Sequence, residues 1–296
     1  MVLRKDKYIW LITAAALLLY VPLFLFRDFT PANELKYINI VDHMIKSGDW
    51  IKLQFDGALY TDKPPLYFWI TALIRLAAGK YTLFSIGLVV CILPAIVTGL
   101  DIYRFLCENN YDRKRAFTVI LILYTTLYFA GSVLVIRMDI LMTMFIVRAL
   151  ISFYNRAEKN TGNPYMPYVY AGIGFLVKGL AAVFIPISVI VVYLLITKQV
   201  HKLKELKLGK GIIVIIIFAL IWLIPLAVSL GINSTINELI LKQTINRAVN
   251  TSVHKKPFYY YLVNLFPNLF PWTLFFFSSF IILIGRIKKQ EKFVIF

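Results

Sequence analysis

The sequence predicts an all-α protein that crosses a membrane several times. Of its 296 residues, 60% are hydrophobic and the mean hydropathy is +0.75, whereas soluble domains are about half apolar. Apolar runs of about 20 residues, the length that a helix needs to cross the hydrocarbon core, recur along the chain. The aromatic share of 16% points the same way, because Trp and Tyr favour the headgroup layer. We therefore expect a bilayer to be the solvent.

The formal net charge of +17 does not indicate nucleic-acid binding in this context. The basic residues fall in short segments between apolar runs, as the positive-inside rule predicts for cytoplasmic loops. The two cysteines, Cys91 and Cys107, suggest neither a disulfide framework nor a metal site. The first apolar run, residues 8–26, is too long for a cleavable signal and lacks a small-residue cleavage site. It is expected to be an uncleaved first span.

About eight transmembrane helices are expected. The candidate spans are residues 8–26, 82–106, 116–136, 140–154, 166–177, 179–197, 211–230 and 261–285.

The apolar run 64–79, which carries Arg75, is ambiguous, and the charge distribution decides its placement. If this run crossed the membrane, the next three basic clusters would move outside. If it lies along the outer surface, every basic cluster and the N-terminus fall in the cytoplasm. The second topology also places residues 198–210 inside and requires a sharp outer turn near Lys178-Gly179.

The first outer segment, residues 27–63, predicts a helix lying in the membrane interface. Thr30-Pro31 favours a helix start and Gly48 a helix end. At helical spacing one apolar stripe forms from Tyr37, Ile38, Val41, Met44 and Ile45. Glu34 falls on this stripe. It is either a first-turn carboxylate favoured by the helix dipole or an acid aimed into a cavity, and the residues alone leave both open.

The predicted topology gathers ionisable side chains at the outer face. They are Glu34, Asp62, Lys63, Arg137, Asp139, Lys178, Arg247 and His254. An ionised side chain at helix-centre depth costs about 2.5–3.5 kcal/mol, so charges from several elements at one face predict a polar cavity. For each residue alone, a solvated loop charge is an equally good interpretation. Asp62 and His254 are too few ligands to predict a metal.

Other charges lack a predicted role in chemistry. Arg148 lies within a short span and is expected to pair with a polar neighbour or to extend toward the surface. Asp101 and Arg104 lie at a cytoplasmic helix end. No zinc-protease, hydrolase, Walker or Rossmann motif is present in the sequence.

Several segments, in order, resemble polyprenyl-phosphate-sugar glycosyltransferases, above all the lipid A aminoarabinose transferase and protein O-mannosyltransferase group. The first outer segment carries Pro31-Ala-Asn-Glu-Leu-Lys-Tyr37, Ser47-Gly-Asp-Trp50 and Tyr60-Thr-Asp-Lys-Pro-Pro-Leu-Tyr-Phe-Trp69. Further along come Arg137-Met-Asp139, Lys178-Gly179, Asn246-Arg247, His254-Lys-Lys-Pro-Phe-Tyr-Tyr-Tyr261 and Pro271-Trp272. The Lys-Pro-Pro-Leu run with its upstream acidic helix is fairly specific, and the likeness covers nearly the whole chain.

The resemblance implies a GT-C-like fold and defines the expected domain. Residues 1–296 would form one transmembrane domain, with juxtamembrane helices in an outer segment at 27–80 and a second outer loop at 231–260. Family members continue through further spans, commonly into an outer soluble domain. Residues 293–296 look like the opening of another span. We therefore expect a fragment that lacks C-terminal spans and the outer domain.

The resemblance also implies inverting transfer of a sugar from a polyprenyl phosphate to lipid A, a glycan or a protein. The reaction would take place at the outer, periplasmic face of the plasma membrane. The family's usual acidic pair is Asp-Glu, whereas this chain has Asn33-Glu34. Glu34 and Asp139 are the candidate catalytic carboxylates. Donor and acceptor binding is assigned to Asn33, Asp62, Lys63, Arg137, Lys178, Arg247 and His254. No metal, cofactor or nucleic acid is implied, and membrane lipids are the expected surroundings.

Two alternatives remain. A lipid-linked-sugar flippase would also need many spans and a charged cavity, but transporters usually place charges near the midplane, on broken helices in repeated halves. This sequence places its charges at the outer rim and shows no repeat, which favours transfer chemistry. An inactive fragment or a structural membrane subunit is the other alternative.

Overall fold

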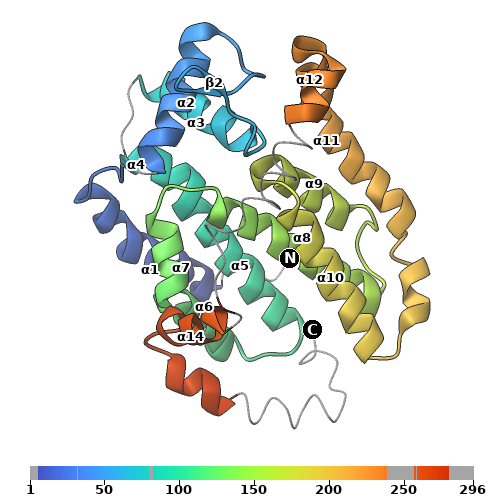
Figure 1. The fold of residues 1–296 in the computed structure, drawn as a ribbon. Helices are drawn as coiled ribbons and strands as arrows, with labels where there is room; N and C mark the ends of the chain where they lie inside the picture. The colour runs from blue at the N-terminus through green and yellow to red at the C-terminus, as the bar shows by residue number, and fades with distance from the viewer. Residues whose placement is uncertain (1–5, 32, 80–82, 239–256, 258, 280–296) are drawn as a thin grey trace.

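The computed structural model describes residues 6–31, 33–79, 83–238, 257 and 259–279, and it is built from helices (Figure 1). Within these residues one small hairpin is present, in which β1 (Gln54–Phe55) pairs antiparallel with β2 (Ala58–Leu59). The all-α prediction is confirmed.

The helices follow one another closely along the chain. They are α1 (Lys7–Leu25), α2 (Glu34–Ser47), α3 (Leu66–Ala78), α4 (Leu83–Gly87), the π-helix η2 (Leu88–Ile92), α5 (Leu93–Glu108), α6 (Arg113–Thr125), α7 (Leu127–Leu134), α8 (Asp139–Lys159), α9 (Met166–Lys178), α10 (Ala181–Ile196), the 3₁₀ helix η3 (Val200–Lys204), α11 (Leu208–Leu230), α12 (Ile232–Ile236) and α14 (Tyr260–Asn268).

Four helices of the described chain are long and apolar enough to cross a membrane. They are α1, the continuous helix Leu83–Glu108 that contains α4, η2 and α5, then α8 and α11. The pair α6 and α7, bent by 63° at Thr126, makes a fifth if it counts as one broken span. These apolar helices indicate an integral membrane protein.

The expected number of about eight spans is wrong for the described residues. Helices α9 and α10 hold 13 and 16 residues, fewer than the roughly 20 that cross the hydrocarbon core untilted. The expected span 261–285 is interrupted after Asn268 and continues past the described residues. Hydropathy alone cannot distinguish a short buried apolar helix from a spanning one, and this explains the excess.

The sharp turn expected near Lys178-Gly179 is confirmed. Helix α9 ends at Lys178, and α10 begins at Ala181. Gly179 has φ 94° and ψ −153°, a region that is essentially restricted to glycine. The turn therefore depends on the residue type at this position.

The outer segment forms α2 and α3, which lie together at one end of the helix bundle (Figure 1). Helix α2 begins at Glu34, later than predicted, and ends at Gly48 in the left-handed conformation as predicted. Its buried face includes Ile40, which the stripe omitted, while Ile38 and Ile45 are only partly buried. Helix α3, with 13 residues, is too short to cross the membrane untilted.

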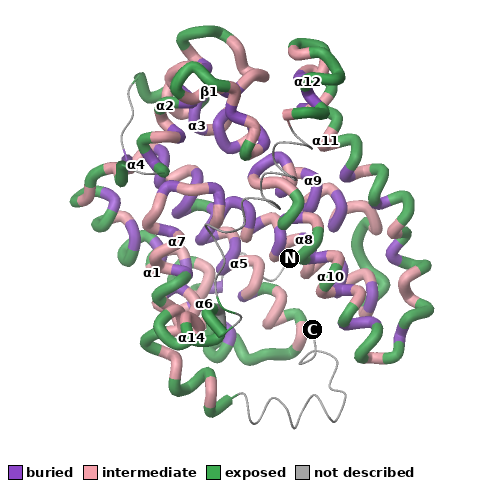
Figure 2. The backbone as a smooth tube through the Cα atoms, viewed as in Figure 1, coloured by how far each residue is buried: buried purple, intermediate pink, exposed green. Residues whose placement is uncertain are grey.

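Burial divides the molecule into a packed centre and apolar outer faces. Figure 2 shows that buried residues concentrate where α5, α8 and α9 meet, whereas α1 and α11 present exposed faces. Only 22% of the apolar window of α1, and likewise of α11, is buried within the protein. Exposed apolar faces of this extent are expected to contact lipid.

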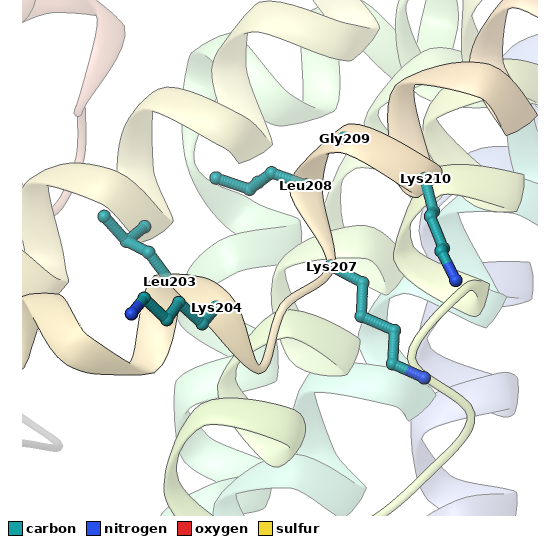
Figure 3. Close-up of a pocket in the computed structure, with 6 residues that line it drawn as sticks. All are labelled: Leu203, Lys204, Lys207, Leu208, Gly209 and Lys210. Carbon is teal, nitrogen blue, oxygen red and sulfur yellow. The ribbon is translucent and has the colours of Figure 1, made fainter.

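The basic segment between α10 and α11 forms a surface cavity of about 530 Å³. In Figure 3 the side chain of Lys204 extends to one side, whereas Lys207 and Lys210 extend to the other. The three ammonium groups do not converge on one point. This arrangement suits separate loop charges that anchor a membrane end.

Candidate active site

Glu34 is the most constrained carboxylate among the described residues. Its side chain is buried, at 1% exposed, and it accepts four hydrogen bonds from protein groups. Arg27 donates from Nη2 to Oε1 at 2.6 Å and from Nη1 to Oε2 at 2.9 Å. The backbone N–H of Ile136 donates to Oε1 at 2.6 Å, and that of Thr30 to Oε2 at 2.7 Å. A carboxylate has about four lone-pair positions, so Glu34 is saturated by protein donors.

These contacts set the protonation state of Glu34. Burial raises its pKa, but the hydrogen bonds from Arg27, Thr30 and Ile136 outweigh burial and hold the pKa below its ordinary value. Glu34 is therefore ionised at neutral pH and already fully hydrogen bonded. Arg27 also donates to the carbonyl of Leu134 at 2.5 Å. The pair thus fastens the end of α1 and the start of α2 to the α7–α8 connection.

Arg27 was not among the site residues predicted from the sequence. The available signal was its position, directly after the first span and seven residues before Glu34. On an isolated helix a spacing of seven would place two residues on one face. Here the pair instead joins across the non-helical segment between α1 and α2.

A second ionic cluster joins the start of α8 to the end of α9. Asp139, the first residue of α8, accepts a hydrogen bond from Lys178 Nζ at the last residue of α9. Its other oxygen lies 3.4 Å from Arg137 Nε. The side chains of Arg137, Asp139 and Lys178 are 43%, 31% and 23% exposed. Unlike Glu34, these groups can reach a ligand.

This ionic cluster borders a cavity of about 320 Å³ between the α7–α8 region and α14. Its lining residues are Leu127, Tyr128, Gly131, Ser132, Val135, Arg137, Asp139 and Asn268. One wall is apolar and the other carries a cation and a carboxylate. Such a site can hold an amphipathic molecule with a charged group.

Tyr37 links the outer segment to the ionic cluster. It is 6% exposed. Burial raises its pKa; the Arg137 charge and a hydrogen bond with Tyr60 oppose the rise, and the Asp139 and Asp62 charges add to it. The pKa of Tyr37 remains above its ordinary value, so the phenol stays neutral. The charges of Asp62, Arg137 and Asp139 all shift the pKa of this one phenol, so all three lie near it. The outer segment therefore approaches the α7–α8 connection.

Lys63 lies on the side of the molecule that carries the end of α9. It is partly buried and immediately follows Asp62. Three residues later, Leu66 packs against the cluster that contains Leu176, near the end of α9 that carries Lys178. The segment of Lys63 and the end of α9 are therefore on the same side of the molecule.

The other predicted site residues are not seen to take part in either ionic cluster of the described residues. Asn33 is exposed at the cap of α2 and makes no side-chain capping hydrogen bond. Arg247 and His254 lie outside the described residues.

The helices and the ionic cluster define a multi-span membrane protein with a polar site at one end of its bundle. Residues 62–222, more than half of the chain, match the family described as dolichyl-phosphate-mannose-protein mannosyltransferase. The chain belongs to this family. The matched region begins at Asp62 and contains Lys63, Arg137, Asp139 and Lys178.

The chain is also similar to curated transferases from bacteria. The chain is 28% identical over 256 residues to the undecaprenyl phosphate-alpha-4-amino-4-deoxy-L-arabinose arabinosyl transferase of Aeromonas hydrophila, a match that covers 83% of this chain and 45% of the relative. It is 24% identical over 271 residues to arabinosyl transferase 1 of Pseudomonas fluorescens, covering 88% and 46%. The chain thus spans about half the length of these relatives.

The fold is shared with a solved transferase. ArnT from Cupriavidus metallidurans bound to undecaprenyl phosphate superposes with a TM-score of 0.78 at 19% identity, covering 94% of this chain and 51% of that one. Its apo structure gives a TM-score of 0.76. The GT-C membrane fold expected from the sequence is therefore confirmed.

Proposed function

We propose that the chain is the transmembrane catalytic part of a glycosyltransferase. In this proposal a sugar moves from a polyprenyl-phosphate donor to an acceptor on lipid, glycan or protein at the outer face of the plasma membrane. The observation that carries the proposal is the position of Asp139 between Arg137 and Lys178 beside a half-apolar cavity. The names of the relatives make an undecaprenyl-phosphate pentose the first donor to test.

The site suits the departure of a lipid phosphate. In the transfer, the bond between sugar C1 and the phosphate oxygen breaks, and the lipid phosphate leaves with the electron pair. Arg137 and Lys178, with Lys63 nearby, supply the cations that stabilise this growing negative charge. The acceptor oxygen attacks C1 from the opposite face, which inverts the configuration. The proton of a hydroxyl acceptor passes to a carboxylate.

The contacts favour Asp139 over Glu34 as that carboxylate. Glu34 has its lone pairs occupied by four protein donors and is buried. Asp139 is partly exposed and lines the cavity. We therefore assign Asp139 to the acceptor proton and treat Glu34 as a positioning residue.

The test is donor cleavage by the purified chain. The chain is incubated in detergent with a panel of undecaprenyl-phosphate sugars and a lipid acceptor, and released undecaprenyl phosphate is measured. Asp139→Asn should lower turnover by about 100-fold or more, the usual contribution of a positioned base. Lys178→Gln should weaken donor binding by about tenfold, as expected for one charge-assisted hydrogen bond. The control is Lys46→Gln, an exposed lysine on α2 that should change neither quantity.

Two results would contradict the proposal. One is turnover by Asp139→Asn equal to that of the unmodified chain. The other is passage of labelled donor across vesicles containing the chain with no lipid phosphate released, which would favour the flippase alternative.

A further inference from the structure

A second polar cavity, of about 270 Å³, lies between α5, α8 and α9. It is distinct from the candidate active site. Asp139 begins α8, whereas Asn155 of the second cavity lies near its end. At 1.5 Å per residue the two positions are about 24 Å apart along the helix axis. The cavity therefore faces the opposite end of the bundle.

Two stripes of polar side chains form the walls. On α5, Asp101, Arg104 and Glu108 recur at the spacing of one helix face. On α8, Arg148 and Asn155 do the same, one above the other. Polar faces within apolar helices of a membrane protein are uncommon, and they usually serve a ligand or an ion path.

Arg148 is held in place by two contacts, but part of its hydrogen-bonding capacity is free within the described chain. Its Nε donates to Asp101 at 2.7 Å, and its guanidinium lies over the ring of Tyr170 with 5.8 Å to the centroid. Among the residues that the structure describes, its two terminal nitrogens have no hydrogen-bond partner. A fixed guanidinium with free donors is suited to bind a phosphate.

The same cavity also carries hydrogen-bond acceptors, on Asn155 and Glu108. Asn155 Oδ1 is buried and accepts no hydrogen bond from the described residues. An unpaired buried acceptor is unfavourable, so this oxygen needs a donor. Glu108 adds a carboxylate at the end of α5, where the span Leu83–Glu108 ends and headgroups are expected.

We infer that this cavity binds the headgroup of a phospholipid that carries both a phosphate and a primary ammonium. Arg148 and Arg104 contact the phosphate, and Glu108 and Asn155 accept from the ammonium. Two arginines balance two carboxylates in the lining, so the site favours a dipolar headgroup over a net anion. A lipid is the fitting source because the cavity lies near the ends of two spans, Leu83–Glu108 and α8, where lipid headgroups are expected. The inference rests on the membrane fold and not on the transfer reaction.

The experiment measures lipid binding by native mass spectrometry of the purified chain in detergent. Phosphatidylethanolamine, phosphatidylcholine and phosphatidylglycerol with identical acyl chains are supplied in equal amounts. Phosphatidylcholine keeps the charges but lacks ammonium N–H donors, and phosphatidylglycerol lacks the ammonium. Retained phosphatidylethanolamine should exceed each of the others by about tenfold, the effect of one charge-assisted hydrogen bond.

Exposed variants connect the preference to the cavity. Arg104→Gln should lower phosphatidylethanolamine binding by about tenfold, and Glu108→Gln should abolish the preference over phosphatidylglycerol. Both side chains are exposed, so their replacement should leave the unfolding temperature unchanged. The matched control is Arg115→Gln, an exposed arginine on α6 that does not line the cavity.

Three outcomes would overturn the inference. The first is equal retention of the three lipids, and the second is stronger retention of phosphatidylglycerol, which would assign the cavity to an anionic lipid instead. The third is a preference for phosphatidylethanolamine that survives both Arg104→Gln and Glu108→Gln.

Discussion

Arg27 and Glu34 form a bidentate ion pair that determines where the α7–α8 connection lies. Both residues also bond the backbone of that connection, Arg27 at the carbonyl of Leu134 and Glu34 at the N–H of Ile136. Arg137 follows directly, so the position of a cation beside the cavity depends on a pair that does not line the cavity itself.

Replacing Arg27 by Gln should destabilise the protein by about 2–3 kcal/mol. Removing one partner of a buried pair costs about 3–5 kcal/mol, and the partial exposure of Arg27, 23%, reduces that cost. Arg27→Lys should recover only part of the loss, because an ammonium cannot donate bidentately. The measurement is the free energy of unfolding in mixed detergent micelles.

The matched control is Lys52→Gln, which removes a partly exposed ion pair with Asp49. Such pairs contribute about 0–1 kcal/mol. An effect of Arg27→Gln no larger than this control would show that the pair does not hold the connection.

Acid should weaken the same contact. The folded-state pKa of Glu34 lies below its ordinary value of 4.5. A depressed carboxyl pKa adds stability that is fully present above the unfolded pKa and is lost as pH falls through the folded pKa. The stability difference between the unmodified chain and Glu34→Gln should thus stay constant above about pH 5 and shrink below it. Thermal unfolding of both proteins between about pH 2.5 and pH 6.5, two units either side of the ordinary pKa, checks this. A difference independent of pH would contradict it.

Gly179→Ala should disturb the α9–α10 turn. No atom lies within 4 Å of an added Cβ, so the cost comes only from the backbone conformation, at about 1–3 kcal/mol. Because Lys178 precedes the turn, donor binding should also weaken. The control is Gly209→Ala in α11, which also has open space but no positive φ. It should be neutral or slightly stabilising. Equal unfolding temperatures for the two variants would refute the prediction.

Asn33→Asp should be tolerated. Asn33 is exposed at the cap of α2 and makes no capping bond with its side chain. A carboxylate there gains about 0.3–1 kcal/mol from the helix dipole, and it gives the acidic pair that the family resemblance implies. Unfolding and donor-cleavage assays measure both effects. Asn39→Asp, at an exposed mid-helix position, should show no gain; a loss of activity specific to Asn33→Asp would count against this account.

Cysteine labelling tests which end of the bundle faces outward. With Cys107 replaced, an impermeant thiol reagent added outside cells should modify Asp49→Cys and not Lys114→Cys. Both positions are accessible on the protein, and the remaining Cys91 is buried. The reverse pattern would place the Asp139 cluster at the cytoplasmic face and contradict the proposed outer reaction.

Much of the fold was accessible from the sequence because apolar length and glycine position are local signals. The spans 8–26 and 211–230, the stop at Gly48 and the turn at Gly179 were all predicted. The number of spans was not, because α9 and α10 begin as apolar runs like those of spanning helices but end after 13 and 16 residues. Their neighbours, not their composition, decide where they lie.

The site was partly predictable for a similar reason. Arg137, Asp139 and Lys178 were recognised because each is a charge at the end of an apolar helix. The saturation of Glu34 was not foreseeable, since two of its four donors are backbone N–H groups and the other two belong to Arg27, a residue outside the motif. A backbone N–H donor is present at almost every residue, so the sequence does not show which of them will bond a given side chain. The sequence therefore indicated that Glu34 matters without indicating how.

The bend between α6 and α7 has a consequence for biosynthesis. At this bend the N–H of Leu127 finds its acceptor in the carbonyl of Phe270, and Trp272 Nε1 donates to Thr125 Oγ1. A free backbone N–H is unfavourable in a hydrocarbon environment, so this kink lacks its native partner until a segment made much later arrives. During synthesis, the region around residue 126 should lack its native hydrogen bonds until residues 270–272 have left the ribosome. Until then it should be accessible to chaperones and proteases.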